Sequence, residues 1–240
     1  MTIPWEVPGP YRVVFSTREG GVSEGPYRSL NLGIFTGDEP ANVVENRRRL
    51  CAAEGVDPER ATMAWQQHGG EVLRARPESI VDPGLRHDPC DGLWSDDPGQ
   101  SMLLLTADCL PIALARLDGE RPAVAVLHAG WRGLLAGIVP AGVAALGSRL
   151  VTAAVGPSIG PCCYEVQEDV AGPMRAAFGT GLVRDGRLDL WTAAERALRA
   201  ACVTRVDRFD LCTACDPARF FSHRRDGGVT GRQGVLARVA

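Results

Sequence analysis

Three side chains of the kinds that bind transition metals occur in well-separated segments of the chain. His68 lies in QQHGGEV, Cys109 in TADCLPI and His128 in LHAGWRG. Each histidine follows a predicted strand and precedes a glycine at once or within two residues, so backbone could approach a ligand closely there. Cys109 comes just after another predicted strand. Two imidazoles and a thiolate at one sheet edge, with a fourth position open, would form a ligand set typical of catalytic zinc.

The spacing of these three residues is not a local metal-binding motif. Cys109 follows His68 by 41 positions and precedes His128 by 19, whereas short fixed spacings mark most structural zinc sites. A buried cysteine is commonly just a small hydrophobic side chain. From the residues alone, a metal site and three unconnected core residues therefore both stay open.

Composition limits the partners that this protein could bind. The 240 residues carry a formal net charge of -3, so no basic field exists to attract nucleic acid or an anionic membrane. We expect small-molecule partners. All 26 basic residues are arginine, because the sequence contains no lysine. This excludes a Schiff-base lysine and a P-loop lysine, so a bound anion would need arginine, backbone N–H groups or a metal.

The cellular location is expected to be the cytoplasm. The N-terminal segment MTIPWEVPGPYRVVF has neither the charged region nor the apolar region of a secretion signal, and no apolar stretch approaches the length of a membrane span. We therefore expect the eight cysteines to be reduced, and their spacing to reflect packing, metal binding or catalysis.

The predicted elements alternate along the chain without a repeat or a long linker. Apolar and β-branched segments predict strands over residues 11–17, 61–67, 71–76, 102–106, 111–117 and 123–128. Amphipathic patterns predict helices over residues 42–55, 133–147, 166–177 and 191–203. We expect residues 1–240 to form a single α+β domain, with mixed β-sheets flanked by helices in a layered sandwich.

At the candidate metal ligands and over nearly its whole length, the chain resembles the laccase-domain proteins. These were long called multicopper polyphenol oxidases and are also known as YfiH-like, zinc-dependent purine nucleoside phosphorylases and deaminases. The segments that carry the resemblance are FSTREGGVSEGPYRSLNLG, QQHGGEV, DGLWSD, TADCLPI, LHAGWRGLLAGI, GPSIGPCCYEV, LDLW, DLCTACD and FFSHRRDGGVTGR. At one position the chain departs from the family, which usually has valine where this chain has Gln67, a change that could alter the pocket wall.

The resemblance implies a zinc-dependent purine nucleoside phosphorylase with adenosine deaminase activity, acting on adenosine, inosine, guanosine and methylthioadenosine. It implies zinc ligands at His68, Cys109 and His128. Zinc can lower the pKa of bound water to about 7, and hydroxide directed at C6 of adenosine would deaminate it. The HxE and PCxxC signature of other zinc deaminases is absent. Asp108 is therefore our candidate acid/base group, with a structural hydrogen-bonding role as the alternative.

Phosphorolysis also needs a phosphate site. Arg18 lies beside two glycines in STREGGVS, and Arg132 lies four residues after His128 at the start of a predicted helix. Both are candidate phosphate ligands, although arginines are commonly solvated surface residues. Asn31, in SLNLG, either hydrogen-bonds the ribose or caps a turn.

Two other enzyme classes stay open. A His₂Cys set also matches a blue-copper site, and Cu²⁺ could replace Zn²⁺ there, but four histidines in the whole chain cannot build the additional copper cluster of a conventional laccase. Alternatively, Cys109 or Cys162 could be the nucleophile of an amidase, with a histidine as the base. Family relatives have been linked to editing of peptidoglycan precursors, which would suit amide cleavage.

The remaining cysteine motifs are weaker evidence for a functional site. Cys162 and Cys163 are adjacent in GPSIGPCCYEV, which is either a functional loop, with Cys162 touching the substrate, or a tight turn with small buried side chains. The segment CTAC has the spacing of half a zinc site, but one CxxC without a second pair is weak evidence. We therefore expect Cys212 to be a core residue and Cys215 to have no special role.

Overall fold

Alternating side chains along the strands divide the molecule into layers. In strand β2 (Tyr11–Ser16), Val13 and Phe15 enter one hydrophobic core and Val14 enters another. Strand β5 (Met102–Thr106) repeats this pattern with Leu104 and Leu103. Successive side chains of a strand point to opposite faces, so both faces of the sheet that contains β2 and β5 are buried. The computed structural model describes residues 1–85, 87–119 and 121–240.

The sheet that contains β2 has four antiparallel strands and a helix on its outer face. Its strand order is β1 (Thr2–Pro4), β2, β12 (Gln233–Val239) and β5. Helix α1 (Pro40–Glu54) packs Leu50 into the core that covers this face. The helix ends at Gly55, which adopts a left-handed conformation with φ 64°, as glycine commonly does after a helix.

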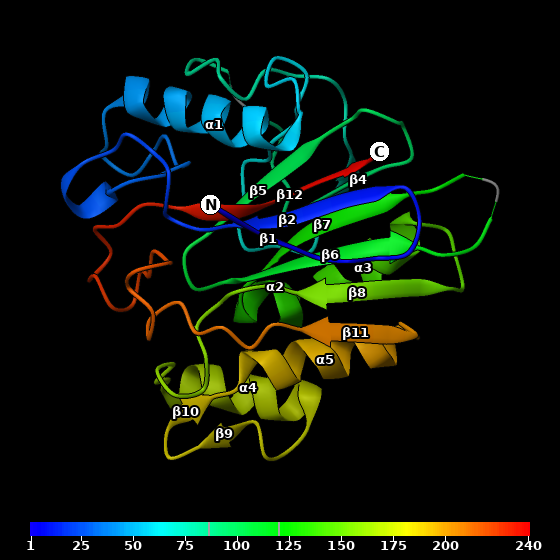
Figure 1. The fold of residues 1–240 in the computed structure, drawn as a ribbon. Helices are drawn as coiled ribbons and strands as arrows, with labels where there is room; N and C mark the ends of the chain where they lie inside the picture. Colours follow the sequence, from blue (N-terminus) through cyan, green and yellow to red (C-terminus); the bar gives the residue numbers. More distant parts are fainter. Residues whose placement is uncertain (86, 120) are drawn as a thin grey trace.

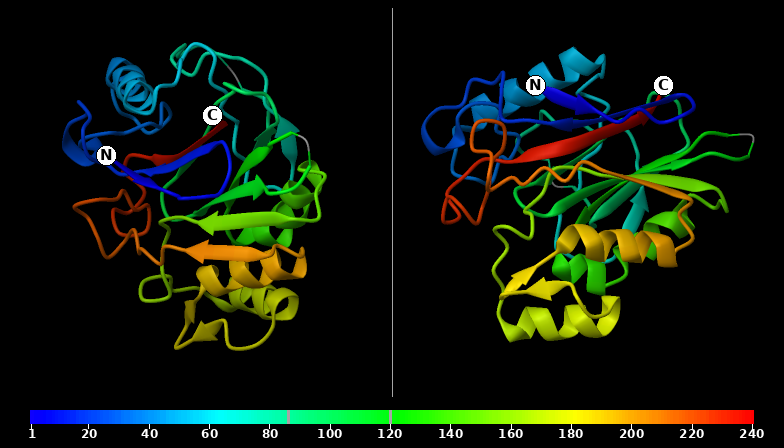
Figure 2. Two further views of the ribbon diagram at one scale, coloured as in Figure 1. Left: turned by 45° about the vertical axis from the view of Figure 1, so that its right-hand side comes forward. Right: turned by 60° about the horizontal axis from the view of Figure 1, so that its bottom comes forward.

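A second, six-stranded mixed sheet packs against the first (Figures 1 and 2). Its strand order is β11 (Arg205–Arg208), β8 (Val151–Val155), β6 (Leu110–Arg116), β7 (Val124–Ala129), β4 (Gly92–Ser95) and β3 (Val72–Arg74). The two outer pairs, β11 with β8 and β3 with β4, are parallel, and the other pairs are antiparallel. Side chains such as Ala113 and Val126 fill the space between the two sheets.

Four helices cover the other face of the six-stranded sheet. These are α2 (Trp131–Leu135), α3 (Ile138–Ala145), α4 (Glu168–Phe178) and α5 (Leu190–Ala200). Their side chains share a core with the strands, as Leu198 does with Ile112 and Leu114. A short hairpin of β9 (Val183–Arg184) and β10 (Arg187–Leu188) and a 3₁₀ turn, η1 (Gly25–Tyr27), complete the described elements. The expected α+β domain with helices flanking mixed sheets is confirmed.

Two predicted elements differ from those observed. Residues 61–67 form no strand, and only isolated bridges at Thr62 and Trp65 remain. The side-chain amide of Gln66 takes the place of a neighbouring strand, because its Nε2 donates to Leu105 O and its Oε1 accepts from Leu105 N. The helix predicted over 133–147 is two helices, divided at Gly137, whose φ is 83°. Among the described residues, no helix is both long enough and apolar enough to cross a membrane.

Candidate functional site

The register of the six-stranded sheet brings four distant segments to one edge. Leu110, at the start of β6, pairs with Ala129 at the end of β7. Gly92, at the start of β4, pairs with Leu127 of β7 and with Val72 at the start of β3. The residues just before β3, β4 and β6 therefore meet the last residues of β7. These segments carry the side chains of His68, Asp91, Cys109 and His128.

The three predicted metal ligands meet at this edge. One donor atom from each of His68, Cys109 and His128 lies within 4.8 Å of the other two. The two imidazole rings are 4.8 Å apart, edge to face, at 70°. His128 is buried, Cys109 is partly buried and His68 is exposed. The three donors are therefore buried on the His128 side and accessible to solvent on the His68 side, as a metal site with an open coordination position requires.

Asp91, which sequence reasoning missed, orients the ring of His128 and fixes the backbone at His68. Its carboxylate accepts hydrogen bonds from His128 Nδ1 at 2.7 Å, from His68 N at 2.9 Å and from Gly69 N at 2.6 Å. These contacts hold His68 in a left-handed conformation with φ 62°, which is uncommon for a non-glycine residue. Because Nδ1 of His128 faces Asp91, Nε2 is left for a metal. The signal in the sequence was an aspartate directly before a strand, in DGLWSD.

The electrostatics of the site favour an ionised cysteine. Burial raises the pKa of the Cys109 thiol, but the neighbouring His128 and His68 outweigh it and lower that pKa to about 6. Burial lowers the pKa of His128, but the Cys109 thiolate and the Asp91 carboxylate raise it to about 9. At neutral pH Cys109 is therefore a thiolate, which is the form that binds metals.

A cavity of about 460 Å³ opens over these three side chains, a size suited to a small organic ligand. Arg132, Arg224 and Arg232 line it together with His223 and Tyr164. Burial raises the pKa of Tyr164 to about 12, so its hydroxyl is protonated at neutral pH and can donate a hydrogen bond. The wall thus offers cationic and donor groups for an anionic ligand.

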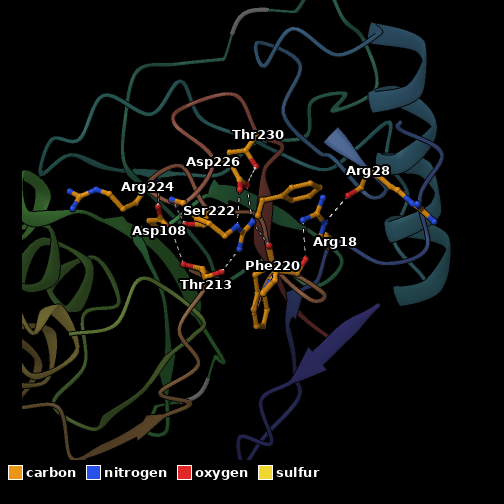
Figure 3. Close-up of polar contacts among 12 residues, drawn as sticks. Arg18, Arg28, Asp108, Thr213, Phe220, Ser222, Arg224, Asp226 and Thr230 are labelled. Atoms are coloured by element: carbon orange, nitrogen blue, oxygen red, sulfur yellow. Dashed lines mark hydrogen bonds and ion pairs between the residues drawn. The ribbon is translucent and has the colours of Figure 1, made fainter. Parts of the chain in front are cut away.

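Asp108 lines the cavity and connects it to two loops (Figure 3). Its Oδ1 accepts from the Thr213 hydroxyl at 2.6 Å, and its Oδ2 accepts from Arg224 N at 2.7 Å. Asp108 has φ 88°, and such strain persists where the surroundings hold it in place. Both carboxylate oxygens have structural partners, and the acid/base role expected for Asp108 stays a prediction.

Of the two arginines predicted to hold phosphate, only Arg132 lines the cavity. Arg18 is used elsewhere: its Nε donates to Arg28 O at 2.7 Å and its Nη1 to Pro217 O at 3.0 Å. Its guanidinium also lies 4.5 Å from the centre of the Phe221 ring. Figure 3 shows Arg18 beside Arg28 and away from Asp108. Arg224 and Arg232 also line the cavity, and of these two it is Arg232 that sequence reasoning missed.

Asn31 and Cys162 are also absent from the lining of this cavity. Asn31 is fully buried; its Nδ2 donates to Thr36 and Asp38, and its Oδ1 accepts from Arg232 N at 2.9 Å. It therefore supports an arginine of the cavity wall from behind. Cys162 lies in a second group of cysteines described below. Gln67, the departure from the family pattern, has an exposed side chain that does not line the cavity.

Replacing Gly130 by alanine is expected to disturb the candidate metal site without unfolding the protein. Gly130 has φ -79°, which any residue can adopt. An added Cβ, however, would lie 3.1 Å from Cys109 Sγ and 3.4 Å from His68 Cδ2. We expect metal affinity to fall about tenfold, as after changes to groups that orient ligands. Zinc competition titration measures the affinity, and far-UV circular dichroism should be unchanged. Unaltered zinc affinity would show that the two ligands do not depend on this close packing.

Comparisons with known proteins agree with these features. The family model described as "Multi-copper polyphenol oxidoreductase laccase" matches residues 12–240. A purine nucleoside phosphorylase of Pseudomonas aeruginosa is 38% identical over 97% of this chain and 95% of its own length. The purine nucleoside phosphorylase YfiH of Escherichia coli is 36% identical over 95% of this chain and 93% of its own length.

Solved structures show the same fold. The crystal structure of YlmD from Geobacillus stearothermophilus superposes with a TM-score of 0.89 at 34% identity, covering 96% of this chain and 93% of that one. The crystal structure of a Neisseria meningitidis protein covers 100% of this chain and 98% of that one, with a TM-score of 0.87 at 31% identity. Sequence and fold agree over nearly the entire length, and this chain therefore belongs to the laccase-domain family, as an enzyme of its YfiH-like branch.

Proposed function

We propose that this protein is a zinc-dependent enzyme that cleaves purine nucleosides with phosphate and also deaminates adenosine. The observation that carries the proposal is the meeting of His68, Cys109 and His128 beneath a cavity walled by arginines. The names of the relatives, purine nucleoside phosphorylases at 35 to 38% identity, support the choice of substrate.

The residues fit a zinc ion. Two imidazole nitrogens and a thiolate are common zinc ligands, and three protein ligands leave a position open for reaction. Asp91 fixes the ring of His128 through Nδ1, as carboxylates do for many metal-binding histidines. When bound, zinc would supply a Lewis acid that activates water or polarises a substrate atom.

Phosphorolysis would use the cationic wall of the cavity. A phosphate oxygen forms a bond to C1′ of the ribose, the C1′–N9 bond breaks with its electron pair going to the purine, and the purine gains a proton. Arg132, Arg224 and His223 can hold the phosphate by charge-assisted hydrogen bonds. The protonated hydroxyl of Tyr164 can donate to the purine or the sugar. Asp108 positions Arg224 by accepting from its backbone N–H.

Deamination would add water at C6 of adenosine and release ammonia. It needs a group that carries a proton between the water and the leaving amine. Among the described residues that line the cavity, Asp108 is the acidic one. It is therefore our candidate for this step, although its contacts with Thr213 and Arg224 N would have to loosen during turnover.

The phosphate dependence of adenine release tests the proposal. Zinc-loaded protein incubated with adenosine and phosphate is expected to release adenine, and removal of phosphate should stop this release. A chelator should abolish both adenine and inosine formation, and added zinc should restore them. Zinc-saturated protein that forms neither product from adenosine would overturn the proposal.

A cysteine nucleophile is the second candidate, because Cys109 is a thiolate beside His128. Reaction with iodoacetamide separates the two roles. In metal-free protein the thiolate fraction grows as pH rises through the pKa, so alkylation of Cys109 should reach half its maximal rate near pH 6, well below the ordinary value of 9.0. A metal ligand should be protected by stoichiometric zinc. Alkylation that zinc does not slow, with loss of activity, would favour the nucleophile.

A further inference from the structure

A second group of thiols lies outside the cavity described above. One sulfur from each of Cys162, Cys163, Cys212 and Cys215 lies within 4.8 Å of the others, and none forms a disulfide. We propose that these four cysteines bind a second zinc ion in a closed, structural site. This proposal does not depend on the reaction proposed for the cavity.

The distances between the sulfurs suit one tetrahedral ion. Zinc–sulfur bonds of about 2.3 Å in a tetrahedron place the sulfurs about 3.8 Å from one another. The Sγ atom of Cys215 lies 3.4 Å from that of Cys162 and 3.4 Å from that of Cys163. A disulfide would need about 2 Å. Four sulfurs around a single point match a mononuclear centre, and tetrahedral sulfur coordination selects zinc or iron among common metals.

The fold explains why two cysteine pairs meet. Cys162 and Cys163 follow strand β8, and Cys212 and Cys215 follow strand β11. Because β8 and β11 are adjacent and parallel, the loops after them leave the same edge of the sheet. The loops remain paired beyond the strands, since Ser158 N donates to Leu211 O and Thr213 N donates to Ser158 O. CxxC at 212–215 is a spacing that zinc sites often use.

The backbone around the group also supports thiolate ligands. Gly160 N donates to Cys212 Sγ at 3.2 Å, and such donors stabilise the charge of a sulfur that binds a metal. Gly160 can approach this closely because it has no side chain: an added Cβ would lie 3.2 Å from Cys162 Sγ and 2.6 Å from the ring of Trp191. Cys212 packs against the main hydrophobic core, as expected. The CxxC segment is not isolated, however, because the pair Cys162–Cys163 lies beside it.

The position of the group indicates its role. Tyr164 follows Cys163 directly and lines the cavity. Thr213 follows Cys212 directly and donates its hydroxyl to Asp108. An ion held by both pairs would join the two loops that place these residues. Four protein ligands leave no open position, so the site would stabilise structure and take no direct part in the reaction.

Zinc content of matched variants tests the proposal. The natural protein is expected to hold about two zinc ions per chain, and the double variant Cys162→Ser, Cys215→Ser about one. His68→Ala should also hold about one, because it loses the ion of the cavity and keeps that of the cysteines. Cys202→Ser is the matched control, since Cys202 is exposed and outside both groups, and should hold about two. Elemental analysis by mass spectrometry measures these numbers.

X-ray absorption spectroscopy of His68→Ala makes the result independent of how the cysteine variants fold. Its remaining zinc should show four sulfur neighbours and no nitrogen, and cobalt substitution should give the visible bands of a tetrahedral thiolate centre. His68→Ala protein with no zinc, with iron in its place, or with a disulfide between these cysteines would overturn the proposal. Failure of the adenosine assay alone would contradict only the proposed reaction.

Discussion

Replacing His68 by alanine is expected to lower kcat/KM for adenosine with phosphate by more than about 100-fold. Removal of a group that only orients a metal ligand costs about 10-fold to 100-fold, and His68 is itself a proposed ligand. Because the His68 side chain is exposed, the fold should survive its removal. Steady-state kinetics measure the effect, and the zinc content should fall by one ion of the two expected.

His87→Ala is a suitable control for this variant. His87 is a histidine outside the cavity whose Nδ1 lies 2.8 Å from Glu78 Oε2. Its replacement should leave the zinc content and kcat/KM unchanged. If His68→Ala kept normal activity with normal zinc, the assignment of His68 as a ligand would be wrong. If it lost activity but kept all its zinc, His68 would contact the substrate and not the metal.

Replacing Asp91 by asparagine is expected to weaken zinc binding by about 10-fold to 100-fold. Asparagine keeps the size of the side chain, but one carboxylate oxygen becomes an NH₂ group that cannot accept hydrogen bonds. His128 Nδ1 and the amides of residues 67–69 would then compete for a single acceptor. We also expect a loss of about 1–3 kcal/mol in the free energy of unfolding, as for a buried donor left without a partner.

The Asp91→Asn prediction is measured by zinc competition titration and by chemical denaturation. Asp96→Asn is its control, because Asp96 lies beyond the other end of β4 and pairs with Arg74. That variant should bind zinc normally. Normal zinc affinity in Asp91→Asn would show that the carboxylate only shapes the turn at His68 and does not tune the metal ligands.

Local pattern predicted three of the strands that are buried on both faces. Strand β5 was predicted with its observed bounds, and β6 and β7 within one residue, because continuous runs of leucine, valine and alanine end at turn residues. Strands β8 and β12 are buried as fully and were not predicted, and β12 pairs with β2 and β5, both more than 100 residues away. Residues 61–67 were predicted as a strand from their apolar and β-branched pattern, but in the structure the Gln66 side chain takes the place of strand pairing there.

Residue type pointed to the candidate site only at side chains that commonly bind metals. His68, Cys109 and His128 are of residue types that commonly bind zinc, but their spacing left three unconnected core residues open, and the family resemblance selected them. Asp91 resembles any aspartate before a strand until the register of β4 against β7 brings it to His128. Arg18 and Arg132 were predicted as phosphate ligands on similar grounds. In the structure, Arg132 lies in the cavity wall, whereas carbonyl groups and Phe221 surround Arg18.

The fate of adenosine in ¹⁸O-labelled water is the measurement that tests the central claim most directly. Zinc-saturated protein would be incubated with adenosine, with and without phosphate, and the products identified by chromatography and mass spectrometry. We expect adenine and unlabelled ribose 1-phosphate only when phosphate is present, and inosine that carries the label at C6. Labelled free ribose in place of ribose 1-phosphate, or no conversion of adenosine, would contradict the account.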